Sequence, residues 1–173
     1  MITELQENGN ISQYLAKKPR ANRTRLLLDV AFGMQFLHEN GIIHGSLKPS
    51  NILITDNGES CIADCGMIMA VPSADTFSHH YYSPEMWEGM ITPYSDVYAF
   101  GMCMFDVLTS ERPWGNLPYD RIRQLVVEQD KRPNRPEGEA WDIRTIPDDI
   151  WNLLRRAWVR VERARPGFAE IIS

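Results

Sequence analysis

The chain has 173 residues, of which 43% are hydrophobic and 24% are charged. This length suits one domain with a substantial hydrophobic core, and this balance excludes a disordered or collagen-like chain, so we expect a single unit over residues 1–173. The 18 basic and 23 acidic residues give a formal charge of −5, and such a charge provides no general attraction for nucleic acid or for an anionic membrane surface.

Helical patterns dominate the first part of the chain. A short helix is expected over residues 10–17. The strongest helix is predicted from about residue 23 to residue 39, where apolar residues recur three or four positions apart, with Asn22 as its N-cap and Gly41 as its stop. The apolar face of this helix is expected to lie against the core.

A hairpin follows the long helix. Two short apolar segments, 51–55 and 60–63, flank an Asp-Asn-Gly turn and predict a pair of antiparallel strands. Further helices are expected over residues 96–108, 119–129 and 148–159. The sequence therefore predicts an α+β fold that is mainly α-helical.

The cysteines and the N-terminal residues indicate the compartment. Cys61, Cys65 and Cys103 lie among apolar residues and form neither a paired metal-binding motif nor a disulfide-dense pattern, so we expect free thiols in a reducing environment. The longest apolar run, 97–105, has half the length that crosses a bilayer, and residues 1–20 hold no apolar signal-peptide core. We expect a cytoplasmic protein without a membrane partner, the nucleus being the open alternative.

The residues with chemical potential lie at one end of the predicted hairpin. The segment 44–51, His-Gly-Ser-Leu-Lys-Pro-Ser-Asn, leads into the first strand, and Asp64 follows the second. Asn51 and Asp64 at two ends of a hairpin can share a hard divalent cation, and Lys48 beside them can meet a phosphate oxygen. The pattern indicates phosphoryl transfer, although an isolated Asp-x-Gly turn carries little information.

In this order, these residues resemble the catalytic half of a eukaryotic protein kinase domain. His44-x-x-Leu47-Lys48-x-x-Asn51 is similar to the kinase catalytic loop, and Asp64-x-Gly66 is similar to the metal-binding D-F-G motif. Ser83-Pro84-Glu85 is similar to the A-P-E motif. The resemblance implies a protein-kinase-like fold and protein substrates or partners.

The later part of the chain extends this resemblance. Residues 95–101, Ser-Asp-Val-Tyr-Ala-Phe-Gly, resemble the start of the central helix of a kinase. Trp158 together with Arg165-Pro166-x-Phe168 resembles the closing motif of tyrosine-kinase-like kinases. Lys48 corresponds to the serine/threonine type of catalytic loop.

The resemblance also implies which part of a kinase domain these residues represent. Residues 1–5 and 7–11 look like the last strand of the N-lobe, the hinge and the first C-lobe helix, so we expect the hinge and the C-lobe with the N-lobe missing. No Gly-rich phosphate loop, strand lysine or partner glutamate occurs among these 173 residues. By this resemblance the nucleotide-binding residues are Glu4, Leu5, Leu53 and Asp64.

The catalytic positions of the family are occupied by Ser46, Lys48, Asn51 and Asp64, and the implied metal ligands are Asn51 and Asp64. Ser46 stands where an active kinase has the Asp that takes the proton of the acceptor hydroxyl, and such assistance is worth about 10² to 10⁴ in rate. Gly45 replaces the arginine that holds a phosphorylated activation segment. ATP and magnesium binding is therefore expected to be weak or absent.

Two functional interpretations remain open. The first is a pseudokinase-like domain of impaired catalysis that acts in binding or signalling through protein partners. The second is a fragment of an ATP-dependent Ser/Thr or Tyr protein kinase that transfers the γ-phosphate to protein hydroxyls. A further hypothesis is that apolar residues near Ile2, Leu5 and Leu53 are uncovered and need a partner chain.

Several residues have structural interpretations. The resemblance implies that His44 and Asp96 tie the 44–51 loop to the central helix, and that Glu85 and Arg165 form a buried ion pair. His79 and His80 lack metal-ligand partners in the sequence, and we expect them on a loop surface. Four tryptophans are expected to pack within the helical part: Trp114, Trp141, Trp151 and Trp158.

The segment between Asp64 and Glu85 carries hydroxyl side chains that could be phosphorylated. Ser78 stands where similar kinases keep a threonine near the catalytic loop. The simpler expectation is that the hydroxyls of this segment are ordinary exposed loop residues, namely Thr76, Ser78, Tyr81 and Tyr82. Cys65 stands in place of the usual Phe of the D-F-G motif and provides a smaller side chain.

Overall fold

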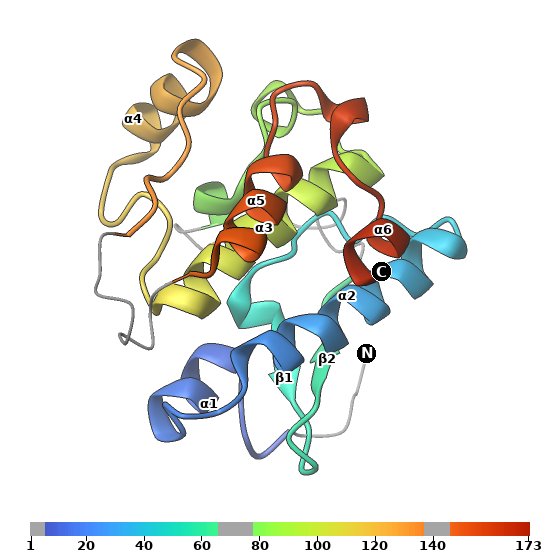
Figure 1. Ribbon diagram of the computed structural model, residues 1–173. Coiled ribbons are helices and arrows are strands. Elements are labelled where there is room, and N and C mark those ends of the chain that lie inside the picture. Colours follow the sequence, from blue (N-terminus) through green and yellow to red (C-terminus); the bar gives the residue numbers. More distant parts are fainter. Residues whose placement is uncertain (1–5, 66–77, 137–145) are drawn as a thin grey trace.

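The computed structural model describes residues 6–65, 78–136 and 146–173 (Figure 1). The two strands are β1 (Ile52–Ile54) and β2 (Ser60–Ile62). The helices, in chain order, are α1 (Ile11–Lys17), α2 (Arg23–Glu39), α3 (Pro93–Thr109), α4 (Tyr119–Arg123), α5 (Asp148–Ala157) and α6 (Phe168–Ile172). The shorter turns are η1 (Pro49–Asn51), η3 (Ser78–Tyr81), η4 (Met86–Glu88), η5 (Gln124–Glu128) and η6 (Glu162–Ala164). The predicted mainly helical α+β fold is confirmed.

Helix α3 forms the centre of the molecule. Thirteen of its 17 residues are buried, which is the signature of a helix surrounded by other elements on all sides. Figure 1 shows α5 across one side of α3 and α2 beneath it. Gly101 permits the close approach of α5, because a Cβ atom at this position would lie 3.1 Å from the Cβ atom of Ala157.

Helix α2 has the bounds that the sequence predicts. The side-chain oxygen of Asn22 accepts a hydrogen bond from the Arg25 amide at 3.0 Å and caps the first turn. Beyond the last turn, Gly41 has a φ of +71°, a conformation that residues with a Cβ atom rarely adopt. One face of α2 is buried against the core through Leu26, Leu27, Val30, Ala31 and Met34.

The predicted antiparallel hairpin is confirmed. Residues 52–54 pair antiparallel with residues 60–62, with Leu53 opposite Cys61. The strands are shorter than predicted because Asn51 belongs to the turn η1 and Thr55 to the hairpin connection. Strand β2 crosses α2 closely at Gly33, where an added Cβ atom would lie 2.8 Å from the Ile62 side chain. Packing on α2 thus gives this two-stranded ribbon the cover that an isolated hairpin lacks.

The other helices differ from the prediction at their ends. Helix α3 begins at Pro93, three residues before the predicted start, because Thr92 and Ser95 exchange side-chain to backbone hydrogen bonds of 3.2 Å in a capping box. The predicted helix 119–129 is divided into α4 and the π-helical turn η5, and α5 ends at Ala157. Helix α6 is not among the predicted elements. No helix in the described ranges combines the length and apolar character that crossing a bilayer requires.

The carboxylate of Asp96, at the start of α3, holds the beginning of the 44–51 loop. Its Oδ2 accepts a hydrogen bond from the His44 amide and its Oδ1 accepts one from the Gly45 amide, both at 2.8 Å. The Nε2 atom of His38 lies 2.9 Å from Oδ2. Asp96 is 1% exposed, and Gly45 has a φ of +74°, which lets two successive amides face one carboxylate. The predicted tie between the loop and the central helix is confirmed, but it runs through the backbone of His44.

A buried ion pair joins the end of the chain to the segment before α3. The Arg165 guanidinium donates to both carboxylate oxygens of Glu85, from Nη1 at 2.5 Å and from Nη2 at 2.9 Å. Ser95 Oγ also donates to Glu85 at 3.0 Å, and Arg165 Nη1 donates to the Tyr94 carbonyl at 2.9 Å. The predicted Glu85–Arg165 pair is confirmed, with two parallel hydrogen bonds that fix its geometry.

The first prediction concerns Asp96. Replacing it with Asn places an NH₂ group against one of the two donating amides, so a buried donor loses its acceptor. We expect Asp96→Asn to lower the free energy of unfolding by about 3 kcal/mol in urea titrations. The matched control is Asp56→Asn in the exposed hairpin turn, which is expected to change it by less than about 0.5 kcal/mol. Equal stability of the two variants would contradict the anchoring role of Asp96.

The second prediction concerns pH. Burial by itself would raise the pKa of Glu85, but the hydrogen bonds and the charge of Arg165 outweigh it and hold the pKa below the ordinary value of 4.5. A carboxylate with a depressed pKa stabilises the fold above that ordinary value, and this contribution is lost as the pH falls through the folded-state pKa. We expect Glu85→Gln to cost about 3 kcal/mol at pH 7 and progressively less below about pH 4.5 in urea titrations.

An exposed ion pair provides the control for this measurement. Arg123 Nη1 and Glu128 Oε1 lie 3.4 Å apart with both side chains about half exposed, so Glu128→Gln is expected to change stability by less than about 0.5 kcal/mol at either pH. A cost of Glu85→Gln that stays constant between pH 7 and pH 3 would show that the charge of Glu85 is not what stabilises the pair.

Candidate functional site

His44 opens the loop as a neutral, buried scaffold residue. Its Nδ1 atom accepts a hydrogen bond from the Ser46 amide at 3.1 Å, so the proton resides on Nε2, which donates to the Ala63 carbonyl at 3.1 Å. Burial lowers the pKa of His44, while the nearby carboxylates of Asp96 and Asp64 oppose this shift only in part. The ring therefore connects the loop to the end of β2, in agreement with the predicted structural role.

The next contact fixes the position of Ser46. Asn51 Nδ2 donates a hydrogen bond to the Ser46 carbonyl at 2.9 Å, which closes the loop on itself. Asn51 is buried at the end of η1, directly before β1, and Ser46 is half-buried. Together with the bond from the Ser46 amide to His44, this contact constrains the backbone on both sides of the Ser46 side chain.

Lys48 joins the loop to the segment that precedes α3. Its Nζ atom donates to Ser78 Oγ at 2.8 Å, and both residues are buried. Ser78 belongs to η3, 30 residues further along the chain. The prediction that Ser78 lies near the 44–51 loop is confirmed, and this contact also determines where the charge of Lys48 is held.

Asp64 lies at the same end of the hairpin as Asn51. The Ala63 amide donates to the Asn51 carbonyl at 2.9 Å, which brings the residue before Asp64 against the end of the loop. Asp64 is exposed and has a φ of +59°, a conformation that Asp tolerates better than most residues. The backbone pairing of Ala63 with Asn51 therefore brings the two residues predicted to bind metal to the same end of the hairpin. An amide oxygen and a carboxylate are the hard oxygen donors that magnesium prefers, so the residue types fit such an ion.

The other implied nucleotide-binding residues are only partly described. Leu53 is half-buried in β1, opposite Cys61 and bridged to Asn10. Glu4 and Leu5 lie outside the described residues, as does Ile2. Within the described ranges, no cluster of three or more His, Cys, Asp or Glu residues is arranged to hold a metal ion.

The prediction of a surface position is wrong for His80. This residue is 1% exposed, and its Nδ1 lies 2.7 Å from the Pro113 carbonyl, to which it donates. The His79 ring is half-buried and contacts Trp87 and Tyr119 edge to face, with ring centroids 6.3 Å and 5.4 Å apart. The rings of the two histidines also contact each other, with centroids 4.6 Å apart, and tertiary contacts supply further partners that the local sequence does not contain.

The prediction of exposed loop hydroxyls is wrong for Ser78 and Tyr81. Both are buried, and the Tyr81 hydroxyl donates to Asp106 Oδ2 at 2.8 Å. Burial and the Asp106 carboxylate raise the pKa of Tyr81. Tyr82 is half-buried beside Trp87, with ring centroids 5.6 Å apart, and Thr76 lies outside the described residues. Of these four hydroxyls, the three that the structure describes are therefore not simple surface groups.

The tryptophan prediction is confirmed where the structure describes it. Trp158 is buried and contacts half-buried Trp151 edge to face, with ring centroids 5.6 Å apart. Trp114 is half-buried against the core, and Trp141 lies outside the described residues. These rings support the helical packing around α3 and α5.

Sequence reasoning missed two basic side chains of α2 that contact the ends of α3, namely buried Arg23 and half-buried His38. His38 contacts the Asp96 carboxylate, and Arg23 Nη1 donates to the Val107 carbonyl and, at 2.7 Å, to Ser110 Oγ. The apolar periodicity of α2 gives no signal for either polar residue. Both contacts provide hydrogen-bond partners for groups at the ends of α3.

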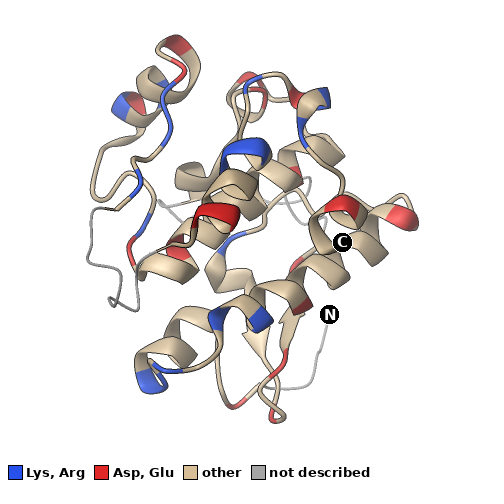
Figure 2. Cartoon of the chain, viewed as in Figure 1, with Lys and Arg blue, Asp and Glu red and all other residues tan. Residues whose placement is uncertain are grey.

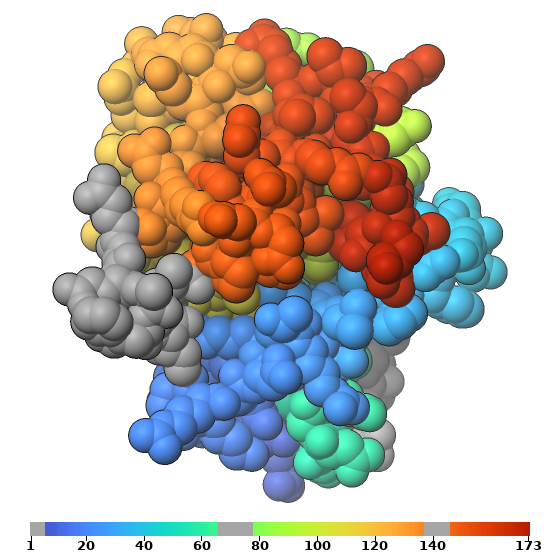
Figure 3. Space-filling view, viewed as in Figure 1, coloured from blue at the N-terminus to red at the C-terminus, as the bar shows by residue number. Residues whose placement is uncertain are grey.

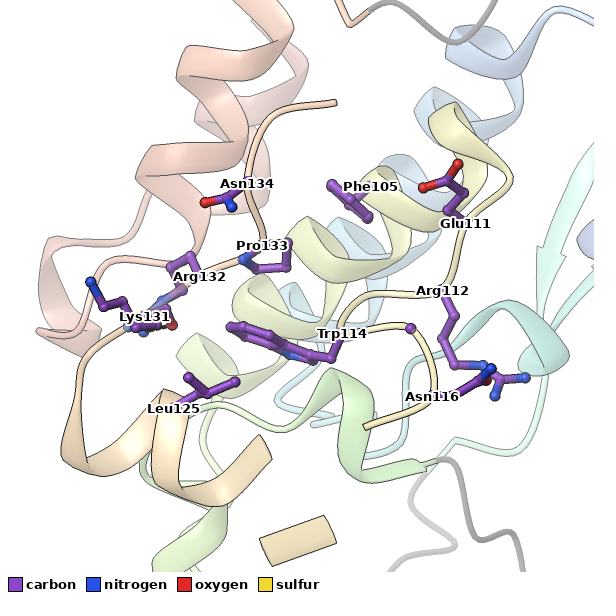
Figure 4. Close-up of a pocket in the computed structure, with 11 residues that line it drawn as sticks. Phe105, Glu111, Arg112, Trp114, Asn116, Leu125, Lys131, Arg132, Pro133 and Asn134 are labelled. Atoms are coloured by element: carbon purple, nitrogen blue, oxygen red, sulfur yellow. Dashed lines mark hydrogen bonds between the residues drawn. The ribbon is translucent and has the colours of Figure 1, made fainter. Parts of the chain in front are cut away.

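One cavity, with a volume of about 850 Å³, lies away from the 44–51 loop, past the C-terminal end of α3 and opposite the end that carries Asp96. Figure 4 shows the Trp114 ring near Leu125 and Pro133, while the Arg112 side chain points away from Lys131. A smaller polar pocket of about 390 Å³ adjoins the loop and is lined by residues that include Lys48, Ser50, Tyr81, Asp106 and Arg112.

Comparison with known proteins identifies the family. Residues 1–173 match the family described as protein tyrosine and serine/threonine kinase. The chain is 31% identical to the serine/threonine-protein kinase STY46 of Arabidopsis thaliana over the whole chain and 31% of that protein. It is 28% identical to the serine/threonine/tyrosine-protein kinase HT1 of the same plant, over the whole chain and 45% of that protein.

A relative outside the plants shows the same pattern. A probable LIM domain-containing serine/threonine-protein kinase of Dictyostelium discoideum is 30% identical over 98% of the chain and 26% of its own length. The chain thus spans less than half the length of each of these relatives. With its ordered motifs and the contacts that join them, the chain belongs to the protein tyrosine and serine/threonine kinase family.

Proposed function

We propose that this chain is a kinase-like domain of impaired catalysis, pseudokinase-like, that acts in binding or signalling through protein partners. The observation that carries this proposal is Ser46. It occupies the middle of a loop whose backbone is held by His44 and Asn51, and its hydroxyl is neutral near pH 7. A neutral hydroxyl cannot accept the proton of an attacking alcohol as a carboxylate does.

The arrangement around Ser46 supports a retained scaffold without a base. Asp96, His44 and Asn51 hold the loop in place. General-base assistance is worth about 10² to 10⁴ in rate, so a well-formed loop that lacks the base is expected to be slow whatever else it binds. Protein partners, in this proposal, recognise the loop and the surfaces around it.

A weak nucleotide site is the second part of the proposal. Asn51 and Asp64 supply the oxygen atoms for a magnesium ion, which when bound would neutralise phosphate charge. Leu53, Glu4 and Leu5 would contact the nucleotide, and Lys48 would act on a phosphate only by exchanging its bond with Ser78. We further assign the chain to the hinge and C-lobe part of a tyrosine-kinase-like kinase in the cytoplasm.

A second candidate function is active phosphoryl transfer from ATP to Ser, Thr or Tyr hydroxyls, by a longer protein that includes this chain. The retention of Lys48, Asn51 and Asp64 together favours it, and relatives such as STY46 and HT1 carry kinase names. The two candidates differ in one measurable quantity, which is the rate of phosphate transfer by a protein that has serine at position 46.

The third prediction tests the proposal with radiolabelled ATP, magnesium and a generic protein substrate. We expect no transfer by the chain above the background of Asp64→Asn, because the proton acceptor is absent. Rapid transfer that disappears in Asp64→Asn would overturn the proposal and favour the second candidate. The variant Ser46→Asp places a carboxylate where the base is absent. Because the Ser46 side chain is only half-buried, we expect the unfolding temperature of this variant to be close to that of the wild type.

The fourth prediction separates nucleotide binding from catalysis. We expect Mg-ATP to raise the unfolding temperature of the chain by a small amount, about 1–2 °C at millimolar ligand, and Asp64→Asn to abolish this shift. For the unfolding temperature of Ser46→Asp in the preceding prediction, the matched control is Ser50→Asp. It adds the same carboxylate to an exposed position of the same loop. A shift that persists in Asp64→Asn would exclude Asp64 as a ligand of the magnesium ion.

A further inference from the structure

We propose that the exposed face of α2 is a self-association surface, through which two copies of this chain pair antiparallel about a two-fold axis at Phe32. The surface, here called the α2 stripe, consists of Arg25, Leu28, Phe32, Phe36 and Glu39. It is separate from the 44–51 loop, so this inference does not depend on the proposed function.

Three large apolar side chains make the centre of the α2 stripe. Leu28 is 40% exposed, Phe32 51% and Phe36 64%, although the opposite face of the same helix is buried in the core. Their spacing of four residues places them next to one another along the helix. A run of this kind is more than the scattered apolar residue that any soluble surface carries.

The two ends of the α2 stripe carry opposite charges. Arg25 lies three residues before Leu28 and Glu39 lies three residues after Phe36, and both are exposed. Glu39 also accepts a hydrogen bond from Gln35 at 2.7 Å, which keeps its carboxylate on the helix surface. At 100° per residue all five members of the stripe fall within about 80° of the helix circumference. They therefore form one narrow line on the side away from Val30 and Met34.

The order of these residues is self-complementary. In an antiparallel pair of α2 helices centred on Phe32, each residue meets the one equally far on the other side of the centre. Phe32 then meets Phe32 of the second copy, Leu28 meets Phe36, and Arg25 meets Glu39. A two-fold interface requires this property, because both copies present the same patch.

The charges determine the direction of the pairing and favour a second copy as the occupant. A parallel pair would place Arg25 against Arg25 and Glu39 against Glu39, whereas the antiparallel pair forms two attractive contacts. Figure 2 shows basic and acidic positions interspersed over the described part of the chain. Figure 3 shows atoms of α2, in blue, open to solvent on the front face beside α5 and α6.

The area of the α2 stripe is small for a dimer interface. From the full areas of such side chains, its exposed apolar part is on the order of 300 Å² per copy. The resulting buried area of roughly 600 Å² is below the 1,000 Å² or more of a stable interface. We therefore expect a weak, reversible dimer that forms only at high protein concentration.

The fifth prediction is tested by sedimentation velocity of the chain from about 5 to 500 µM. We expect a rise from monomer towards dimer over this range for the wild type and monomer throughout for Phe32→Glu. Val161→Glu is the matched control, because Val161 is 67% exposed but lies outside the α2 stripe, and it should dimerise as the wild type does. A wild type that is monomeric at 500 µM, or one that dimerises equally well with Phe32→Glu, would overturn the proposal.

A charge exchange tests the register. Arg25→Glu and Glu39→Arg should each weaken self-association about tenfold, because each converts two attractive contacts into repulsive ones. An equimolar mixture of the two variants should restore association to the wild-type level. Both changes place charges favourably in the helix dipole, so the loss cannot arise from unfolding of α2, and circular dichroism melting curves check this. A mixture that associates no better than either variant alone would overturn the antiparallel register.

Discussion

Two oxygen atoms of Asp96 accept hydrogen bonds from two consecutive backbone amides, and this contact determines where the 44–51 loop lies relative to the core. The carboxylate is buried at the start of the central helix, where water does not compete for the amides. Each hydrogen bond to a buried charged group is stronger than one between neutral groups. Because α3 is packed on nearly all sides, its first turn is a fixed point from which the loop extends.

Two further contacts hold segments that are distant in the sequence. Lys48 reaches Ser78, and Glu85 reaches Arg165 across 80 residues. The three ties together connect the loop, the segment before α3 and the end of the chain to one another. Each involves a charged or polar group with little exposure to water, so the loss of any one of them is expected to lower stability. Site geometry and folding stability therefore depend on the same contacts.

The contacts that hold the 44–51 loop also determine the position of Ser46. A serine in a poorly ordered turn would carry little information, but the backbone of Ser46 is held by a hydrogen bond to His44 and by one from Asn51. The chemistry proposed for the site follows from which side chain occupies that fixed position. The α2 stripe is a different kind of feature, because it lies on the side of α2 away from these contacts and depends only on the helix itself.

The local elements and the order of the motifs follow from the amino-acid sequence. The bounds of α2, its Asn22 cap and the hairpin pairing follow from periodicity and turn residues, which act over a few neighbouring positions. The resemblance of the motifs to a kinase also located Ser46, Lys48, Asn51 and Asp64, and the Glu85–Arg165 pair. Periodicity and turn residues act over a few positions, and the motifs are recognised from their order along the chain.

Tertiary structure alone decided which polar groups are buried and with what partners. His80, Ser78 and Tyr81 look like loop residues in the sequence, yet the elements around them supply the Pro113 carbonyl, Lys48 and Asp106. The contact of His38 with Asp96 joins residues 58 positions apart, and no local pattern encodes it. The physical reason is that a hydrogen bond between distant segments depends on how the whole core packs, whereas a helix or hairpin depends on its immediate neighbours.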